Sequence, residues 1–282
     1  MKKQQWLFGL AAIILVIGLY AATKNQVFGV SKVIKPVAST VITENTVSTD
    51  SILLNARKSL NPEQSTRLNF LEHSISRGDV KNQQLLIYQQ LAHFWADSAK
   101  RFEPYAWYRA EEARLENSEK SLTFAAHLFL NSLTAEENPE IKKWEAFQAK
   151  DLFERSLKLN PENDSSKVGL GAVYLYGGIS TPMQGVAMIR QVADKNPSDI
   201  YAQMTLGQAS FASGQLDKAI ERFKAVIRLE PGNIEALLLL GEVAEQMGNK
   251  PGAVEWYKKS LPFLKIPGLK KEVEARIADL SK

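Results

Sequence analysis

The sequence contains no cysteine, and this absence excludes several kinds of chemistry. Without thiols the chain can form no disulfide bond, no thiolate nucleophile and no zinc–sulfur site. The redox compartment is left open, because a cysteine-free chain suits an oxidising or a reducing environment. Histidine is also scarce: the only ones are His73, His93 and His127, and none lies in a His-Glu-x-x-His motif. We therefore expect no metal centre.

Motifs for nucleotide binding and for nucleophilic catalysis are missing as well. The chain has no P-loop and no Gly-x-Ser-x-Gly elbow. Gly169-Leu170-Gly171 is an isolated Gly-x-Gly without a third glycine, so we interpret these glycines as packing residues. The carboxylate pairs Glu111–Glu112 and 136–137 are expected on solvated helix faces or loops. We accordingly predict no enzyme activity, no cofactor and no small-molecule substrate.

The excess of positive charge is confined to the N-terminal part of the chain. The whole sequence has 35 basic and 31 acidic residues, and residues 1–48 hold five lysines against the single acid Glu44. The remainder therefore carries 30 of each kind and is neutral. A nucleic-acid-binding domain would show a basic face, so we expect no nucleic-acid partner.

An uncharged run from Trp6 to Ala22 follows the basic start of the chain. Its 17 residues would span about 26 Å as a helix at ~1.5 Å per residue, close to the roughly 30 Å of a bilayer core. Trp6 and Tyr20 lie near its ends, where aromatic residues favour the interface. A cleaved signal peptide is the alternative, but Ala21-Ala22-Thr23 is an imperfect cleavage site. We predict an uncleaved transmembrane anchor over residues 1–23.

The orientation of this anchor is indicated only weakly. Lys2 and Lys3 precede it, while Lys24, Lys32 and Lys35 follow it, so both flanks are basic. A short basic N-terminus usually stays in the cytoplasm, which favours a body outside the cytoplasm of a bacterial inner membrane. A cytoplasmic body is the alternative. Residues 24–48, rich in Val, Thr and Ser, are expected to form a flexible tether.

The second half of the chain repeats itself with a period of 34 residues. The correspondences pair Leu206-Gly207 with Leu240-Gly241, Gly214 with Gly248, Ala219 with Ala253, and Phe223 with Tyr257. Apolar positions around them have helical spacing, which predicts two amphipathic helices in each copy.

The repeated residues are those that a tight helical hairpin needs. Gly207 and Ala219 let two helices approach closely, and Phe223 fills the space beside them. Gly214 falls in the turn, where a positive φ is usual. Pro231 ends the second helix, because proline cannot continue the hydrogen-bond ladder. A single hairpin cannot bury its apolar faces, so such units stack in arrays.

A helix–turn–helix unit of 34 residues resembles the tetratricopeptide repeat (TPR) family. The resemblance implies an all-α solenoid. Weaker copies of the frame extend it towards the N-terminus, with an insertion around 133–143. The predicted organisation is helices over 49–84, a solenoid over 85–267 and a capping helix over 268–282. The five repeats of the solenoid are predicted at 85–118, 119–163, 164–199, 200–233 and 234–267.

Family resemblance also implies where a partner would bind. First helices line the concave surface, and their second, fifth, ninth and twelfth places, with neighbours, face it. The predicted groove residues are Gln89, His93, Lys120, Phe124, His127, Asn131, Tyr176, Tyr201, Gln208 and Phe211. His93 and His127 occupy equivalent places. The lysine–asparagine clamp of chaperone-binding members is absent, since its places hold residues such as Gln89, Thr123, Val168, Met204 and Leu238.

These observations favour a membrane-anchored scaffold for protein–protein interaction. It would hold a peptide or helix of a partner protein in the concave groove and assist the assembly or translocation of envelope proteins, as bacterial anchored TPR proteins do. Two alternatives stay open. One is an accessory subunit of a maturation complex of the cytochrome c assembly type, and the other is a cytoplasm-facing receptor for precursor proteins.

Overall fold

The computed structural model describes residues 47–75 and 81–282, which form helices and connecting turns without a β-strand. Thirteen α-helices occur in these two ranges, with one π-helical turn and one 3₁₀ turn. Among them, none has both the length and the hydropathy that crossing a bilayer requires. The predicted span from Trp6 to Ala22 lies outside the described residues, as does the predicted tether up to residue 46.

The helices begin with α2 (Thr49–Arg57) and α3 (Pro62–Ile75) and end with α14 (Pro267–Leu280). Short turns η1 (Phe94–Ser98) and η2 (Leu261–Phe263) follow the helices α4 and α13. Between α3 and α14 lie five helical pairs, each packed as a hairpin. They are α4 (Lys81–His93) with α5 (Phe102–Glu116), α6 (Glu119–Ala135) with α7 (Pro139–Leu159), α8 (Asp164–Tyr176) with α9 (Pro182–Lys195), α10 (Ile200–Ala212) with α11 (Leu216–Leu229), and α12 (Ile234–Gln246) with α13 (Lys250–Ser260).

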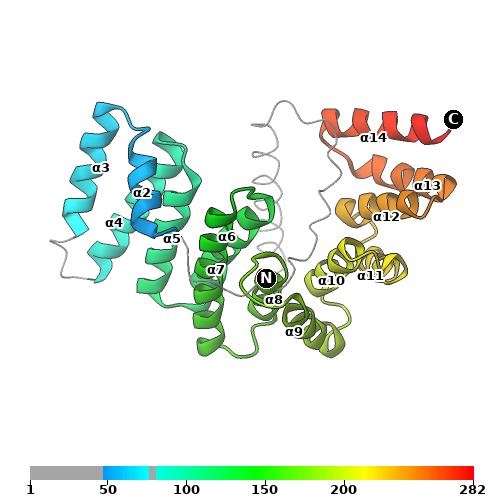
Figure 1. Cartoon of the computed structure of the whole chain (residues 1–282), viewed down its shortest axis with the longest axis horizontal. Coiled ribbons are helices and arrows are strands. Elements are labelled where there is room, and N and C mark those ends of the chain that lie inside the picture. Colours follow the sequence, from blue (N-terminus) through cyan, green and yellow to red (C-terminus); the bar gives the residue numbers. More distant parts are fainter. Residues whose placement is uncertain (1–46, 76–80) are drawn as a thin grey trace.

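The pairs follow one another along an arc (Figure 1). The first helices α6, α8, α10 and α12 lie on its inner side, and the second helices α7, α9, α11 and α13 lie outside. Each pair packs on the next, and one apolar core joins α2 to the helices from α5 to α10, while α3 and α4 contribute to a separate cluster. This is the predicted all-helical, TPR-like solenoid, with the first helix of these pairs on the concave face.

A recurring side-chain cap fixes the start of the first helices α8, α10 and α12. Asn163, Asp199 and Asn233 each accept a hydrogen bond from the amide three residues on, at 2.8, 2.8 and 2.9 Å. Each satisfies an amide that has no partner within its own helix. The same turn geometry therefore returns at the entry to α8, α10 and α12.

Close contact between the two helices of a pair depends on glycine. A Cβ on Gly207 would come within 2.5 Å of the Phe223 ring, and one on Gly241 within 2.3 Å of the Tyr257 ring. Gly214 has a φ of +75° in the turn between α10 and α11. The packing and turn roles predicted from the repeat pattern are therefore confirmed.

The segment predicted as an insertion is mostly helical. α6 continues to Ala135 and α7 starts at Pro139, so only residues 136–138 connect them. Asn138 caps α7 by accepting from two amides, and proline follows at the first helical position, which favours helix initiation. Trp144 of α7 packs edge-on against Phe129 of α6 and donates to the Thr49 hydroxyl of α2 at 2.9 Å. The extra turns thereby hold α2 against the solenoid.

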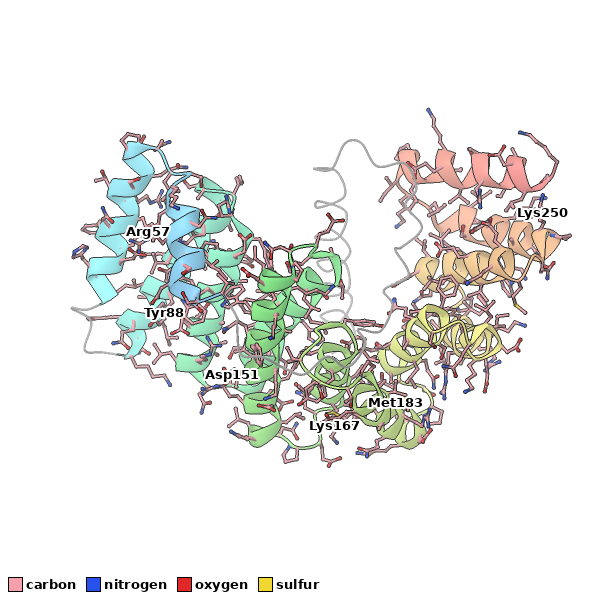
Figure 2. The ribbon with its side chains drawn as sticks, viewed as in Figure 1. Arg57, Tyr88, Asp151, Lys167, Met183 and Lys250 are labelled. Carbon is pink, nitrogen blue, oxygen red and sulfur yellow. The ribbon has the colours of Figure 1, made fainter. Side chains whose placement is uncertain are left out.

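An ion pair and a hydrogen bond connect the outer helices α5 and α7. Arg114 of α5 donates from Nε to Asp151 of α7 at 2.9 Å, and from Nη2 to Gln148 at 2.7 Å. Asp151 is labelled on α7 in Figure 2. At the other end, Val273 of α14 is buried in a cluster with Tyr257 and Leu264, so α14 covers the apolar face of the last pair.

Candidate functional site

On the concave face, side chains of neighbouring helices contact one another, and several of them are at the positions where partner contacts were predicted. His127 of α6 lies within hydrogen-bonding distance of Ser165 of α8, with Nε2 and Oγ 3.1 Å apart. The same imidazole contacts the ring of Tyr201 of α10 edge-on, with centroids 5.5 Å apart. Further along, Gln208 of α10 donates to Glu235 of α12 at 2.7 Å. We call His127, Ser165, Tyr201, Gln208 and Glu235 the concave ladder.

His127 lies at the α6 end of this ladder, where it contacts α8 and α10, and is held in a neutral state. Besides Tyr201, its ring packs edge-on against Phe153, with centroids 5.1 Å apart. Burial disfavours the imidazolium and lowers the pKa of His127 to about 4. At neutral pH the ring is therefore uncharged and offers one donor and one acceptor.

His93 has different surroundings, although the repeat frame gave it the equivalent place. Its side chain is 77% exposed, and Nδ1 lies 3.6 Å from the carboxylate of Asp97. The residue ends α4, and the next five residues form the π-helical turn η1 instead of continuing the α-helix. The structure therefore places His93 on an open surface and His127 in an enclosed one.

The N-terminal part of the predicted groove is a charged cluster. Gln89 donates to Glu112 at 2.7 Å, and Arg109 pairs with the other oxygen of Glu112. The Arg109 guanidinium also lies over the ring of Phe124, 5.4 Å from its centroid, while Phe124 remains 48% exposed. The prediction that Glu112 is solvated was wrong, because the residue is 7% exposed and its carboxylate is neutralised within the cluster.

The remaining predicted groove residues divide into exposed and buried ones. Lys120 and Asn131 of α6 are exposed. Tyr176 and Phe211, which lie at the ends of α8 and α10, are 8% and 7% exposed, and both belong to apolar core clusters. Burial strongly raises the pKa of the Tyr176 hydroxyl, so the phenol is neutral at physiological pH.

Glu235 and Glu242 of α12 are groove residues that were not named from the sequence. They follow Tyr201 and Gln208 by one repeat period of 34, so extending the same frame by one copy would have found them. Within the described residues, Oε2 of Glu242 is buried without a hydrogen-bond partner. Burial, with the nearby Glu245 carboxylate, raises the pKa of Glu242 to about 7. The concave face thus ends in carboxylates that lack a cation.

Comparison with known proteins agrees with this architecture. The family described as "Tetratricopeptide repeat" matches residues 182–234 and 204–264. A stretch of 113 residues is 30% identical to the protein CTR9 homolog of Arabidopsis thaliana, covering 40% of this chain and about a tenth of that protein.

Two solved structures are also similar. A thermophilic TPR protein of Thermus thermophilus, TTC0263, has 16% identity and a TM-score of 0.50, covering 72% of this chain and 99% of that one. MamA from Desulfovibrio magneticus RS-1 has 23% identity and a TM-score of 0.45, covering 66% and 96%. Taken with the glycine contacts, capped turns and paired helices, the family match shows that this chain contains tetratricopeptide repeats over residues 182–264.

Proposed function

We propose that this chain is a membrane-anchored interaction scaffold that holds an extended segment of a partner protein along its concave face. The observation that carries this proposal is the concave ladder, which joins α6, α8, α10 and α12 across that face. Such a ladder presents a row of neutral and acidic hydrogen-bonding groups on a scaffold fixed by the glycine-packed pairs. Rigid presentation lowers the entropy lost on binding.

The side chains along the concave face favour a partner segment with a basic residue at one end. His127 and Tyr201 offer aromatic edges and neutral polar groups near α6 and α10. At the α12 end, Oε2 of the half-buried Glu242 has no hydrogen-bond partner among the described residues. A lysine or arginine of the bound segment would supply that partner and lower the pKa of Glu242. We therefore expect the segment to carry a basic residue where it meets α12.

The test is site-specific photocrosslinking in cells that express the full chain. A photoreactive amino acid at Ser165, which is exposed on the concave face, should form a discrete adduct with a partner protein. The same amino acid at Arg228, exposed on the outer helix α11, serves as the matched control. His127→Ala combined with Gln208→Ala should abolish the adduct at Ser165. Adducts at Ser165 that survive this double variant would show that His127 and Gln208 do not hold the partner, and would overturn the proposal that the concave ladder binds it.

The location of the solenoid is a separate part of the proposal. The uncharged run from Trp6 to Ala22, preceded by Lys2 and Lys3, supports an inner-membrane anchor with the body outside the cytoplasm. Protease added to intact spheroplasts should then digest a tag placed after Lys282. A tag that is digested only after the membrane is permeabilised would place the solenoid in the cytoplasm and redirect the search for partners.

A further inference from the structure

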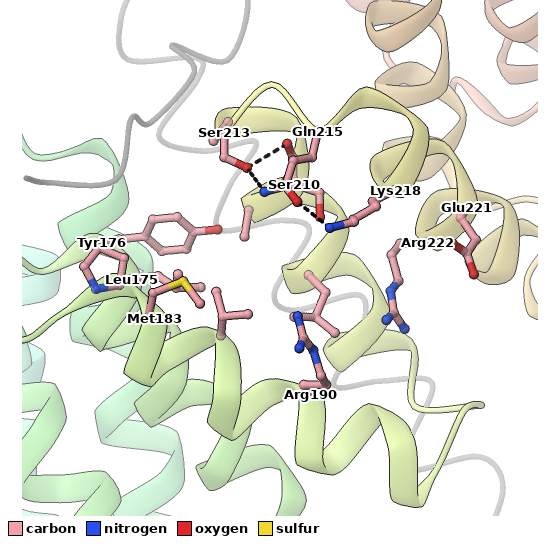
Figure 3. Close-up of a pocket in the computed structure, with 15 residues that line it drawn as sticks. Leu175, Tyr176, Met183, Arg190, Ser210, Ser213, Gln215, Lys218, Glu221 and Arg222 are labelled. Atoms are coloured by element: carbon pink, nitrogen blue, oxygen red, sulfur yellow. Dashed lines mark hydrogen bonds between the residues drawn. The ribbon is translucent and has the colours of Figure 1, made fainter.

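A hollow lies between the α8–α9 and α10–α11 pairs, and none of the residues that line it belongs to the concave ladder. It has a volume of about 500 Å³, and residues of all four helices line it. Figure 3 shows that its two walls differ: Leu175, Tyr176 and Met183 form one side, and Arg190, Lys218 and Arg222 stand on the other. We call this feature the inter-repeat hollow.

The first wall of the inter-repeat hollow is apolar and partly open to solvent. Leu175 and Leu206 are 3% and 5% exposed and belong to the core, so the floor is packed and fixed. Met183, by contrast, is 70% exposed at the start of α9. A flexible thioether adapts to irregular apolar surfaces, and an exposed methionine beside a hollow gives an incoming apolar side chain something to pack against.

The second wall carries positive charge that the described residues do not neutralise. Lys218 donates to the amide oxygen of Gln215 at 2.7 Å, and Arg222 donates to that of Gln203 at 2.9 Å, so both bind neutral partners. Arg190 is exposed and forms no ion pair with any described residue. Elsewhere on the solenoid, arginines such as Arg114 are paired with carboxylates.

One carboxylate, Glu221, also lines the hollow, and in Figure 3 it lies beyond Arg222 at the far edge. Three cations thus face the cavity against one acid. This imbalance is local, because the body of the chain beyond residue 48 carries equal numbers of basic and acidic residues. A ligand that matches both walls must combine an apolar group with negative charge beside it.

We propose that the inter-repeat hollow docks an acidic segment of a second partner protein, with one large apolar side chain against Met183 and Leu206 and flanking carboxylates on Arg190, Lys218 and Arg222. The hollow shares none of the five ladder residues, so the two sites can be occupied together. The chain would then bring two proteins side by side, one in the concave ladder and one in the hollow.

The test measures binding of a fluorescein-labelled peptide, Ser-Asp-Glu-Leu-Phe-Asp-Glu-Ser, to the full chain in mild detergent by fluorescence anisotropy. We expect saturable binding that Arg190→Glu with Lys218→Glu weakens at least about tenfold, because both cations are reversed beside the bound carboxylates. The matched control is Lys224→Glu with Arg228→Glu, which reverses two exposed charges on α11 outside the lining and should leave affinity unchanged. Ser210→Trp should block binding by filling the hollow without altering charge.

Several results would overturn the proposal. One is that the control pair weakens peptide binding as much as Arg190→Glu with Lys218→Glu does. Another is that a peptide with Ser in place of Leu and Phe binds with the same affinity. A third is that the Ser210→Trp variant still binds the peptide. Absence of peptide binding, combined with cosedimentation on phosphatidylglycerol vesicles that depends on Arg190 and Lys218, would assign the cations to a lipid surface instead. His127→Ala should not change peptide affinity, so failure here and failure of the concave ladder are distinguishable. Circular dichroism of each variant checks that it folds.

Discussion

Glu145 provides the sharpest test of the packing between α5, α6 and α7. The residue is 0% exposed, and neither carboxylate oxygen has a hydrogen-bond partner within bonding geometry among the described residues. Burial, with smaller contributions from the carboxylates of Glu136 and Glu103, raises its pKa from 4.5 to about 8, while Ser132 and Lys142 oppose this shift. The carboxyl is therefore mostly protonated in the folded chain at neutral pH.

The sign of the pH dependence follows from this raised pKa. Between pH 4.5 and pH 8 the folded state binds more protons at Glu145 than the unfolded state does, so stability falls as pH rises through this window. The loss amounts to roughly 3 kcal/mol by pH 7 and roughly 5 kcal/mol above pH 9. Glu145→Gln removes the titration while keeping the shape of the side chain. The stability advantage of the variant should be about 1 kcal/mol at pH 5 and should grow steadily as the pH rises towards 8.

The assay is thermal unfolding of the full chain in mild detergent, followed by circular dichroism between pH 5 and pH 9. At pH 7 the variant should melt about 10 °C higher, since 1 kcal/mol shifts the midpoint of a domain of this size by about 2–4 °C. Glu242→Gln is a useful comparison, because the pKa of Glu242 is raised only to about 7 and its effect should be smaller. Identical pH profiles for the native chain and Glu145→Gln would refute the idea of a buried, unpaired carboxyl.

Two further predictions concern the repeats themselves. Gly207→Ala would push a methyl group into Phe223 and should destabilise the chain by about 1–3 kcal/mol, whereas Gly268→Ala, with open space around it, should change stability by less than about 0.5 kcal/mol in the same melt. Arg276→Ala removes the two-pronged ion pair that ties α14 to Glu245, so amide exchange in α14 should accelerate while that in α10 stays constant.

The repeat unit was predictable because its residues act locally and recur. Gly207 and Phe223 meet within one hairpin, so a single copy encodes the contact and the next copy repeats it as Gly241 and Tyr257. The positive φ at Gly214 follows from the same local logic. A sequence pattern with a fixed period therefore predicts both where the helices lie and which face of each helix packs against its neighbour.

Buried charge was less predictable, because it depends on which helices meet at a given level of the solenoid. Glu145 lies in a Trp-Glu-Ala-Phe stretch that does not indicate burial in the sequence, and it becomes buried where α7 packs against its neighbouring helices. Glu112 is buried for a similar reason, since Gln89 and Arg109 approach it from two helices. His93 and His127 also differ, since α4 ends at His93 whereas α6 continues beyond His127 to Ala135, and the 34-residue frame does not show where each helix ends.

The concave ladder and the inter-repeat hollow differ in how tightly each is built into the fold. His127 and Tyr201 rest on Phe153 and on each other, so a change in the curvature of the solenoid would alter ladder geometry directly. The hollow is lined by residues of the α8–α9 and α10–α11 pairs, so the same change would widen or narrow it. Tyr176 lines the hollow and lies near Glu235 of the ladder, as the influence of that carboxylate on its pKa shows. A partner that changed the curvature at one site would therefore bias the other, with the same coupling free energy in both directions.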